Sequence, residues 1–337
     1  MSHRRLTGLI AAVYTPFDRE GRLNLTPIAG MVRRLTEEGV GGIYVCGTTG
    51  EGSSLSTDER QDVAQAYWDA AEDRIPVVIQ VGHNCLADSC RLAEHAQRLG
   101  VHAISANAPS YFRCADLDTL VASMATIAGA APELPFYYYH IPSMNGTVVD
   151  MVKFLERGSR QIPNLVGLKF TQPDLATYQA CVELHDGRFD VLWGCDEMLL
   201  GALATGARGA VGSTYNIAAP LYRRIMEAFE AGDGKLARRL QGRSVAMVRL
   251  IARYPFHYAM KEILKMLGHD FGECRLPQKR LRPEDIDSLR GELEQAGFFD
   301  WAISMTPSAD QKPTTAPPHF SAERLAGNGA YERLNQS

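Results

Sequence analysis

Residues 42–81 read GIYVCGTTGEGSSLSTDERQDVAQAYWDAAEDRIPVVIQV, and this stretch decides the fold class. Two short apolar runs within it, Gly42–Cys46 and Pro76–Val81, are typical of buried strands. Between them, Asp58–Ala71 carries apolar residues at the spacing of a helix face, and Ser56-Thr57-Asp58-Glu59 has the form of a helix-capping sequence. The stretch therefore predicts a strand, a helix and a second strand, which is the repeating unit of parallel α/β proteins.

The same alternation continues through the first two-thirds of the chain. The expected strands are the apolar runs Leu9–Tyr14, Gly42–Cys46, Pro76–Val81, Ala103–Asn107, Phe136–His140, Val166–Phe170, Val191–Trp193 and Gly209–Gly212. Helical spacing predicts helices such as Pro27–Glu38, Asp88–Leu99 and Leu117–Ala128 between them. Eight alternations in about 215 residues favour an α/β fold of the (β/α)8 TIM-barrel type. An open doubly wound sheet is the alternative that periodicity alone leaves open.

Composition changes twice after the expected barrel, which divides the chain into three parts. Residues 1–219 form the barrel, and residues 220–301 are mostly helical, for example at Leu221–Ala231, Lys235–Ala252 and Pro283–Gln295. We expect these C-terminal helices to pack on the barrel as an appendage. Residues 302–337 contain four prolines among Ser, Thr, Gln and Asn, a low-complexity composition typical of a disordered tail.

The overall composition excludes several classes of protein. The chain has 337 residues, 35 basic and 39 acidic side chains, and a net charge of −4, so it is not a basic nucleic-acid binder. No apolar run approaches the roughly 18 residues of a membrane span, and the N-terminal residues lack the apolar segment of an export signal. Seven scattered cysteines without a C-x-x-C pair indicate neither disulfides nor a zinc site. We therefore expect a cytoplasmic protein with no metal and no membrane or nucleic-acid partner.

In a barrel the functional residues follow the strands, and a glycine-rich loop follows the second one. Gly47-Thr48-Thr49-Gly50-Glu51-Gly52 allows close backbone approach, and its successive N–H groups and two hydroxyls suit a small carboxylate. A tight turn with nothing bound is the structural alternative.

The fifth strand ends in aromatic residues, Phe136-Tyr137-Tyr138-Tyr139-His140-Ile141-Pro142. Strand alternation places Tyr137 and Tyr139 on one face and Tyr138 on the other. A tyrosine at the strand end can carry a proton if a positive neighbour lowers its pKa. Aromatic packing is the alternative for at least two of the three, and His140 is either a base or a hydrogen-bonded core residue.

Lys169 is unusual because it lies in a predicted strand, within Gly167-Leu168-Lys169-Phe170-Thr171, whereas the other six lysines do not. Burial there would lower its pKa from about 10.4 towards neutrality. A neutral amine is what Schiff-base formation with a ketone requires. The alternative is a lysine whose ammonium group reaches solvent at the strand end.

Polar residues also follow the last two strands. Gly194-Cys195-Asp196-Glu197 follows the seventh, and Ser213-Thr214-Tyr215-Asn216 follows the eighth. Their carboxylates and hydroxyls suit a polyol, although Asp196 and Glu197 are equally placed to cap a helix over Met198–Ala204. We expect Cys195 to be a packing residue.

Taken together, these motifs resemble the class I aldolase family of dihydrodipicolinate synthase and N-acetylneuraminate lyase. The resemblance extends from about Leu6 to Leu281, and it rests on motifs that occur in the family's order. These are Gly47-Thr48-Thr49-Gly50-Glu51, Tyr139-His140-Ile141-Pro142, Gly167-Leu168-Lys169-Phe170-Thr171, Gly194-Cys195-Asp196-Glu197 and Gly209–Asn216. The resemblance implies a barrel fold, a homotetramer, and a substrate joined to the lysine of the sixth strand.

The resemblance also implies a role for individual residues. Lys169 matches the Schiff-base lysine, Tyr139 the proton shuttle, and Tyr111 a tyrosine that joins the proton relay at a neighbouring subunit's site. Thr48 and Thr49 match the residues that bind the pyruvyl carboxylate. The positions that match contacts to the hydroxyl chain of the sugar are Thr171, Gly194, Asp196, Glu197 and Ser213. Because the Schiff base is the electron sink, no cofactor is implied.

Met144 bears on the branch, and the departures from the lyase pattern are Thr48, His140 and the long C-terminal tail. Met144 stands where the synthase branch has an arginine that holds a second carboxylate, and a thioether cannot replace that pairing. Thr48 replaces a serine frequent in the lyases but keeps its hydroxyl, and His140 replaces a common asparagine. The resemblance therefore implies cleavage of N-acetylneuraminate to N-acetylmannosamine and pyruvate. The alternatives are a sibling aldolase for another 2-keto-3-deoxy sugar acid, a dihydrodipicolinate synthase, and a non-catalytic sensor of 2-keto acids.

Overall fold

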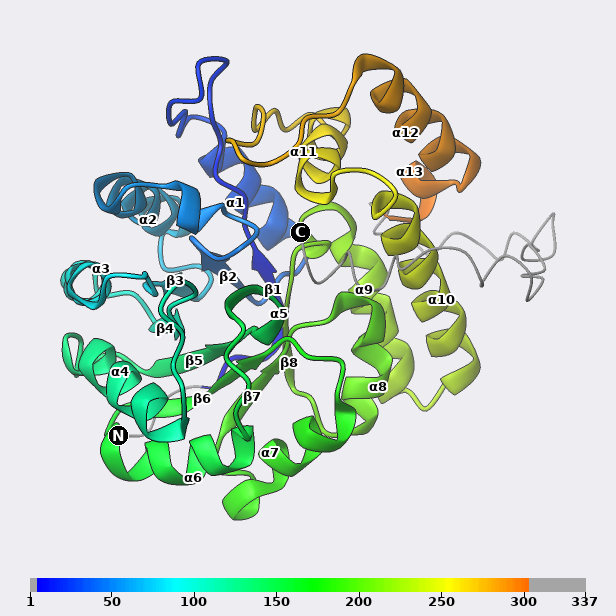
Figure 1. Ribbon diagram of the computed structural model, residues 1–337. Coiled ribbons are helices and arrows are strands. Elements are labelled where there is room, and N and C mark those ends of the chain that lie inside the picture. Colours follow the sequence, from blue (N-terminus) through cyan, green and yellow to red (C-terminus); the bar gives the residue numbers. More distant parts are fainter. Residues whose placement is uncertain (1–4, 303–337) are drawn as a thin grey trace.

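The computed structural model describes residues 5–302, and Figure 1 shows a closed barrel of parallel strands surrounded by helices. The strands follow one another around the barrel in chain order: β1 (Gly8–Ala12), β2 (Gly42–Val45), β3 (Val77–Gln80), β4 (Ala103–Asn107), β5 (Phe136–His140), β6 (Leu165–Phe170), β7 (Asp190–Trp193) and β8 (Gly209–Gly212). β8 pairs with β1 and closes the sheet. The predicted (β/α)8 barrel is confirmed, and the open sheet is excluded.

Helices connect successive strands and cover the outside of the barrel. They are α1 (Ile28–Glu37), α2 (Thr57–Ala71), α3 (Leu86–Leu99), α4 (Leu117–Gly129), α5 (Pro142–Asn145), α6 (Met151–Gln161), α7 (Leu175–Gly187), α8 (Leu199–Ala204) and α9 (Tyr215–Glu230), with short 3-10 turns η1 (Gly52–Ser54) and η2 (Asp196–Met198). The expected capping sequence before α2 is a capping box, in which Ser56 and Glu59 each accept the other's backbone N–H. Local sequence therefore accounts for where this helix begins.

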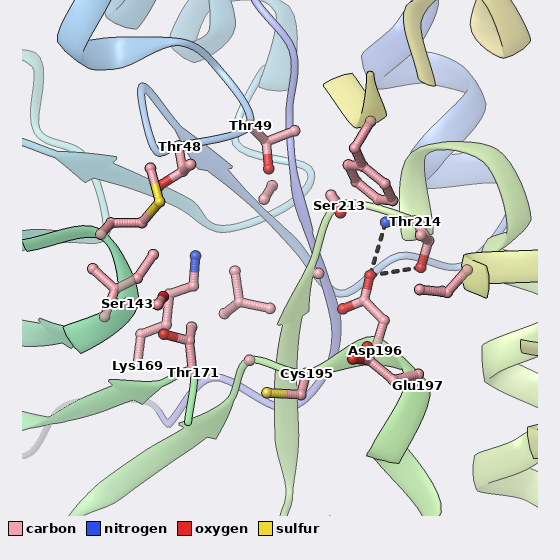
Figure 2. A pocket seen from close by; sticks show the side chains of 18 of the residues that line it. Thr48, Thr49, Ser143, Lys169, Thr171, Cys195, Asp196, Glu197, Ser213 and Thr214 are labelled. Atoms are coloured by element: carbon pink, nitrogen blue, oxygen red, sulfur yellow. Dashed lines mark hydrogen bonds between the residues drawn. The ribbon is translucent and has the colours of Figure 1, made fainter. Parts of the chain in front are cut away.

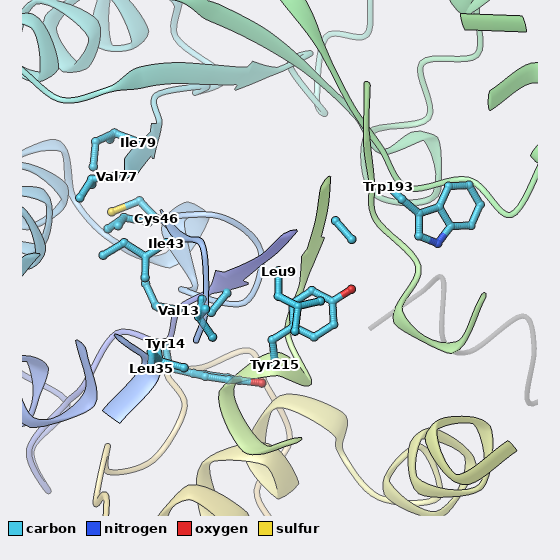
Figure 3. Packing of buried hydrophobic residues seen from close by; sticks show 14 of the residues in the cluster. Leu9, Val13, Tyr14, Leu35, Ile43, Cys46, Val77, Ile79, Trp193 and Tyr215 are labelled. Carbon is cyan, nitrogen blue, oxygen red and sulfur yellow. The ribbon is translucent and has the colours of Figure 1, made fainter. Parts of the chain in front are cut away.

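Two apolar cores lie on opposite faces of the strands. Tyr137 and Tyr139 point into the barrel, whereas Tyr138 packs against the surrounding helices, as strand alternation predicts. Figure 3 shows part of the outer core, which includes Ile43 and Val77 of neighbouring strands and Leu35 of α1. The inner core leaves the carboxyl ends of the strands free for a site.

A glycine brings β6 and β7 close together below that site. A Cβ built at Gly167 would lie 1.7 Å from the carbonyl oxygen of Asp190, so no other residue fits there. The same register pairs Lys169 with Tyr139 of β5 and with Leu192 of β7. Gly167 therefore helps to hold the lysine at a defined place in the barrel.

The remaining helices lie together on one side of the barrel (Figure 1). They are α10 (Gly234–Ile251), α11 (Phe256–Met266), α12 (Pro283–Gln295) and α13 (Phe298–Trp301). α9 runs across the predicted division at 219/220, with a kink at Ala218, and packs against both β1 and α10. The division therefore stays a prediction, while the C-terminal helices themselves are confirmed. The predicted tail from 303 to 337 lies outside the described residues. Within the described part, no helix is both long and apolar enough to cross a membrane.

Candidate active site

A cavity of about 180 Å³ opens where the strands end, and Figure 2 shows its lining. A second cavity of about 740 Å³ shares part of this lining, including Thr48, Tyr139 and His257. Nine of the predicted site residues line the first cavity: Thr48, Thr49, Tyr139, Lys169, Thr171, Gly194, Asp196, Glu197 and Ser213. Tyr111 is not among them, because its side chain is 81% exposed on the loop after β4.

Lys169 stands on β6 with its amine inside the barrel. The residue is only 4% exposed, and Nζ lies 4.2 Å from the ring centre of Tyr44 and 4.0 Å from that of Tyr139. Within residues 5–302, no carboxylate forms an ion pair with it. Burial lowers the pKa of Lys169 to about 7, although the nearby Asp196 carboxylate opposes the shift. A large fraction of the amine is therefore neutral and nucleophilic near pH 7.

Tyr139 lies between this amine and the glycine-rich loop. Its hydroxyl is 3.2 Å from Oγ1 of Thr48. Burial raises the pKa of Tyr139 to about 12, against the weaker effect of the Thr48 hydrogen bond. The phenol is therefore protonated in the free site, and a new positive charge near Lys169 would favour its ionisation.

The loop Gly47–Gly52 is held by contacts from the segment after β1 and from the C-terminal part of the chain. Thr15 Oγ1 donates a hydrogen bond of 2.6 Å to the carbonyl oxygen of Gly50. Glu51 has a positive φ of 54°, and its buried carboxylate accepts from Lys261 Nζ at 2.8 Å and from the backbone N–H of Arg275 at 2.8 Å. These contacts hold Thr48 and Thr49 at the cavity from residues far away in sequence.

Asp196 is buried beneath the end of β8. One of its oxygens, Oδ2, accepts hydrogen bonds from the backbone N–H of Thr214 at 2.9 Å and from Thr214 Oγ1 at 2.6 Å. Burial raises the pKa of Asp196 to about 7, and the two hydrogen bonds from Thr214 oppose the shift. No side chain caps α8 or the η2 turn, so the alternative that Asp196 or Glu197 caps this helix is wrong. Tertiary hydrogen bonds have taken the carboxylate instead.

Thr171 and Gly194 pack closely together in the lining of the cavity. Thr171 Oγ1 donates to the carbonyl oxygen of His140 at 2.6 Å, so its own oxygen can still accept a hydrogen bond from a ligand. A Cβ at Gly194 would lie 2.3 Å from Cγ2 of Thr171. Glu197 and Ser213 complete the polar lining, and burial raises the pKa of Glu197.

Three residues of the C-terminal helices also line the cavity, and the sequence interpretation did not include them. They are Val248, Phe256 and His257. His257 is 8% exposed, and its Nδ1 has no hydrogen-bond partner among the described residues. Burial, with a smaller effect of the Lys261 charge, lowers the pKa of His257 to about 4, so the imidazole is neutral. No spacing in the sequence indicated His257, because it reaches the cavity only through the packing of α11 over the barrel.

The remaining candidates are resolved by their surroundings. His140 is a core residue, since it is buried at the end of β5 with Nε2 3.1 Å from Oε1 of Gln172. Met144, which stands at the motif position where the synthase branch has an arginine, lines the cavity. Burial raises the pKa of Cys195, which keeps this lining thiol protonated. Across residues 5–302, no three His, Cys, Asp or Glu side chains are grouped to hold a metal ion.

Comparison with known proteins places this geometry in a family. The model of the dihydrodipicolinate synthetase family matches residues 5–296. The N-acetylneuraminate lyase of Xenopus tropicalis is 45% identical over 295 residues, covering 86% of this chain and 96% of that protein, and the rat enzyme of the same name is 37% identical over 303 residues, covering 88% and 95%.

Solved structures agree with the sequence relatives. The Proteus mirabilis N-acetylneuraminate lyase is 38% identical with a TM-score of 0.85, and it covers 88% of this chain and 100% of its own. The sialic acid aldolase of Aliivibrio salmonicida is 40% identical, also with a TM-score of 0.85, over 88% and 98% of the two chains. The family expected from the five motifs is thus confirmed: the chain belongs to the dihydrodipicolinate synthetase family.

Proposed function

We propose that this protein is an N-acetylneuraminate lyase, which reversibly cleaves N-acetylneuraminate to N-acetylmannosamine and pyruvate through a Schiff base on Lys169. The observation that carries the proposal is the buried amine of Lys169, which has no carboxylate partner among the described residues and a pKa of about 7. The names of its relatives support the choice of sugar.

The reaction begins when the neutral amine attacks the C2 ketone of the open-chain sugar. Tyr139 gives its phenolic proton to the hydroxyl group of the adduct, which leaves as water, and this step gives a protonated iminium beside a tyrosinate. Its positive charge forms about where Nζ now lies, 4.0 Å from the ring of Tyr139. The pKa of Tyr139, about 12 in the free site, then falls because a cation stands beside the phenol. Substrate attachment thereby prepares the base.

Tyr139 next receives the proton of the C4 hydroxyl, directly or through the substrate carboxylate. The C3–C4 bond breaks, its electron pair moves into the iminium, and an aldehyde and an enamine result. The enamine is protonated at C3, and water then hydrolyses the iminium to release pyruvate and restore Lys169. Because the iminium accepts the electron pair, this route calls for no metal or organic cofactor.

Binding of the rest of the substrate follows from the charge of the lining. Thr48 and Thr49 suit the pyruvyl carboxylate, since their hydroxyls line the cavity and can donate hydrogen bonds. We assign the sugar hydroxyls to the polar lining formed by Thr171, Gly194, Asp196, Glu197 and Ser213. Met144 offers no charge to a second carboxylate, which disfavours the synthase reaction.

The assembly and location are proposed on the same grounds. Tyr111 and Phe112 are 81% and 85% exposed and form an edge-to-face pair with ring centres 5.1 Å apart. Two neighbouring exposed aromatic rings are typical of an interface. We assign them to a subunit contact within a homotetramer, with Tyr111 reaching a neighbour's proton relay, in a cytoplasmic enzyme.

Borohydride trapping with N-acetylneuraminate, followed by peptide mass mapping, tests the proposal. We expect a reduced pyruvyl adduct on Lys169 and none in the Lys169→Ala protein, which also loses turnover. An adduct from pyruvate but not from N-acetylneuraminate would keep the aldolase and change the sugar. No adduct from either compound would leave a 2-keto-acid-binding protein.

A further inference from the structure

A line of buried hydroxyl groups connects the cavity carboxylate to the C-terminal helices. Asp196 Oδ2 is 2.6 Å from Thr214 Oγ1, which is 2.6 Å from the hydroxyl of Tyr222 on α9, which is 2.9 Å from Ser244 Oγ on α10. Thr214 is 1% exposed, and Tyr222 and Ser244 are fully buried. The line thus runs from the ligand cavity to α10 without reaching solvent.

Each hydroxyl has one hydrogen, and this gives the line a direction. An ionised carboxylate only accepts, so Thr214 donates to Asp196. The oxygen of Thr214 must then accept from Tyr222, and the oxygen of Tyr222 must accept from Ser244. Every O–H dipole in the line points toward the carboxylate, and aligned hydrogen bonds polarise one another.

The other oxygen of Asp196 is turned toward the cavity. Both hydrogen bonds from Thr214 end on Oδ2, while Oδ1 lies against Gly212, where a Cβ would approach to 2.0 Å. Figure 2 shows the carboxyl group held on one side by Thr214. A second clamp comes from Gln241 of α10, which accepts from the backbone N–H of Leu200 at 2.8 Å and lies 3.4 Å from the carbonyl oxygen of Asp196.

We propose that Tyr222 and Ser244 are positioning residues that, through Thr214, hold the Asp196 carboxylate with Oδ1 directed at the hydroxyl chain of the sugar. The C-terminal helices thereby set how strongly the sugar part of the substrate binds. The inference rests on the proposed function and deepens it, because it assigns sugar recognition to residues that touch no substrate.

The charge of Asp196 depends on all the groups that face it. The titratable groups around it come from the barrel and from α9 and α11: Lys169 of β6, Tyr14 after β1, Cys195 and Glu197 of its own turn, Tyr215 and Tyr222 of α9, and His257 of α11. Of these, Lys169 favours the carboxylate, and Glu197 opposes it. The pKa of Asp196 is about 7, so losing donors in the line changes its charge near neutral pH.

Condensation of N-acetylmannosamine with pyruvate separates sugar binding from Schiff-base formation. In Tyr222→Phe we expect the KM for N-acetylmannosamine to rise about threefold to tenfold, the size of one net hydrogen bond, with the KM for pyruvate nearly unchanged. Ser244→Ala should act in the same direction and more weakly. Thr214→Val should act more strongly, and Thr214→Ser should restore the wild-type value because it keeps the hydroxyl.

The pH dependence distinguishes this role from simple packing. Loss of a donor to the ionised form raises the pKa of Asp196, so the acid limb of kcat/KM for the sugar should move to higher pH in Tyr222→Phe. The pH dependence of pyruvate trapping on Lys169 should move less and in the opposite direction, because a less ionised Asp196 favours the ammonium form of Lys169 less. Tyr67→Phe is the matched control, since Tyr67 is also fully buried and its hydroxyl donates to the carbonyl oxygen of Tyr14 at 2.5 Å.

The outcomes separate this inference from the proposed function. If wild-type protein traps no pyruvate, the lyase proposal fails. If it traps pyruvate and makes N-acetylneuraminate, yet Tyr222→Phe and Ser244→Ala keep both the KM for N-acetylmannosamine and the acid limb, the positioning role is overturned. Should Tyr222→Phe fail to fold, Ser244→Ala and the Thr214 pair decide the question. The positioning role is also overturned if Tyr222→Phe changes the KM for N-acetylmannosamine and the acid limb no more than Tyr67→Phe does.

Discussion

Two buried lysines, one in the barrel and one in the C-terminal helices, have opposite surroundings. Lys169 of β6 is 4% exposed and faces the rings of Tyr44 and Tyr139. Lys261 of α11 is 2% exposed, and its Nζ donates to the Glu51 carboxylate at 2.8 Å and to the carbonyl oxygen of Glu273 at 3.1 Å. Burial alone therefore does not make a lysine reactive. The absence of a carboxylate in contact leaves Lys169 available for chemistry, whereas its presence makes Lys261 an anchor.

The largest effect expected from this comparison is on turnover. Lys169→Met removes the nucleophile and should lower kcat by at least about 10⁴-fold, whereas Lys261→Met should retain an adduct on Lys169 in borohydride trapping. Steady-state cleavage assays and mass mapping of both variants measure this. Measurable turnover in Lys169→Met above about a hundredth of wild type would contradict the assignment.

The next effect is on stability, and it concerns Lys261. Lys261→Met leaves Glu51 buried without its cation, so we expect a loss of about 3–5 kcal/mol in the free energy of unfolding. The double variant Lys261→Met/Glu51→Gln removes the stranded charge and should recover part of that loss. Urea denaturation of the three proteins measures both quantities. A single variant as stable as wild type would show that the ion pair does not anchor the loop.

The same substitution at Lys169 should increase the free energy of unfolding, whereas Lys261→Met decreases it. The pKa of Lys169 falls from 10.5 in an exposed chain to about 7 when folded, so below pH 7 its charge is buried at a cost. Lys169→Met should therefore raise the free energy of unfolding by about 1–4 kcal/mol at pH 6. The wild-type protein should gain stability between pH 7 and 10, because the unfolded chain then binds more protons. Equal stability of wild type and variant at pH 6 would refute this.

The last effect is graded, because it develops gradually with pH, and it concerns the pH dependence of activity. Both the amine of Lys169 and the carboxyl of Asp196 titrate with a pKa of about 7, and both must be deprotonated for catalysis as proposed. We expect kcat/KM to fall by about tenfold or more for each pH unit well below 7. A pH–rate profile between pH 5 and 8 checks this, with Asp196→Asn as the variant that removes one of the two groups. A profile that stays flat down to pH 5 would show that neither Lys169 nor Asp196 has a pKa near 7 that controls activity.

Strands and the residues that follow them were predictable because they depend on local pattern. The strand containing Lys169 was expected at Val166–Phe170 and lies at Leu165–Phe170, and Tyr137 and Tyr139 share one face of β5 as alternation predicts. The nine residues brought to the cavity follow from the rule that parallel strands present their carboxyl ends on one side of a barrel. The roles of those residues, and of Tyr111, remain predictions.

Other features could not be predicted, because they depend on contacts between distant parts of the chain. The Asp196 carboxylate was equally placed to cap α8, and only the position of Thr214 at the end of β8 shows that it does not. His257 and Val248 enter the cavity because α10 and α11 fold back over it, which no spacing in the sequence indicates.

The two lysines show what local sequence can predict and what depends on tertiary contacts. Periodicity and motif order alone were enough to indicate the barrel, the family and the position of Lys169 on a strand, since all three are encoded by near neighbours. Whether a buried amine is paired depends on an acidic residue up to 210 positions away, as for Lys261 and Glu51. Tertiary packing therefore decided which lysine is an anchor and which is free to react.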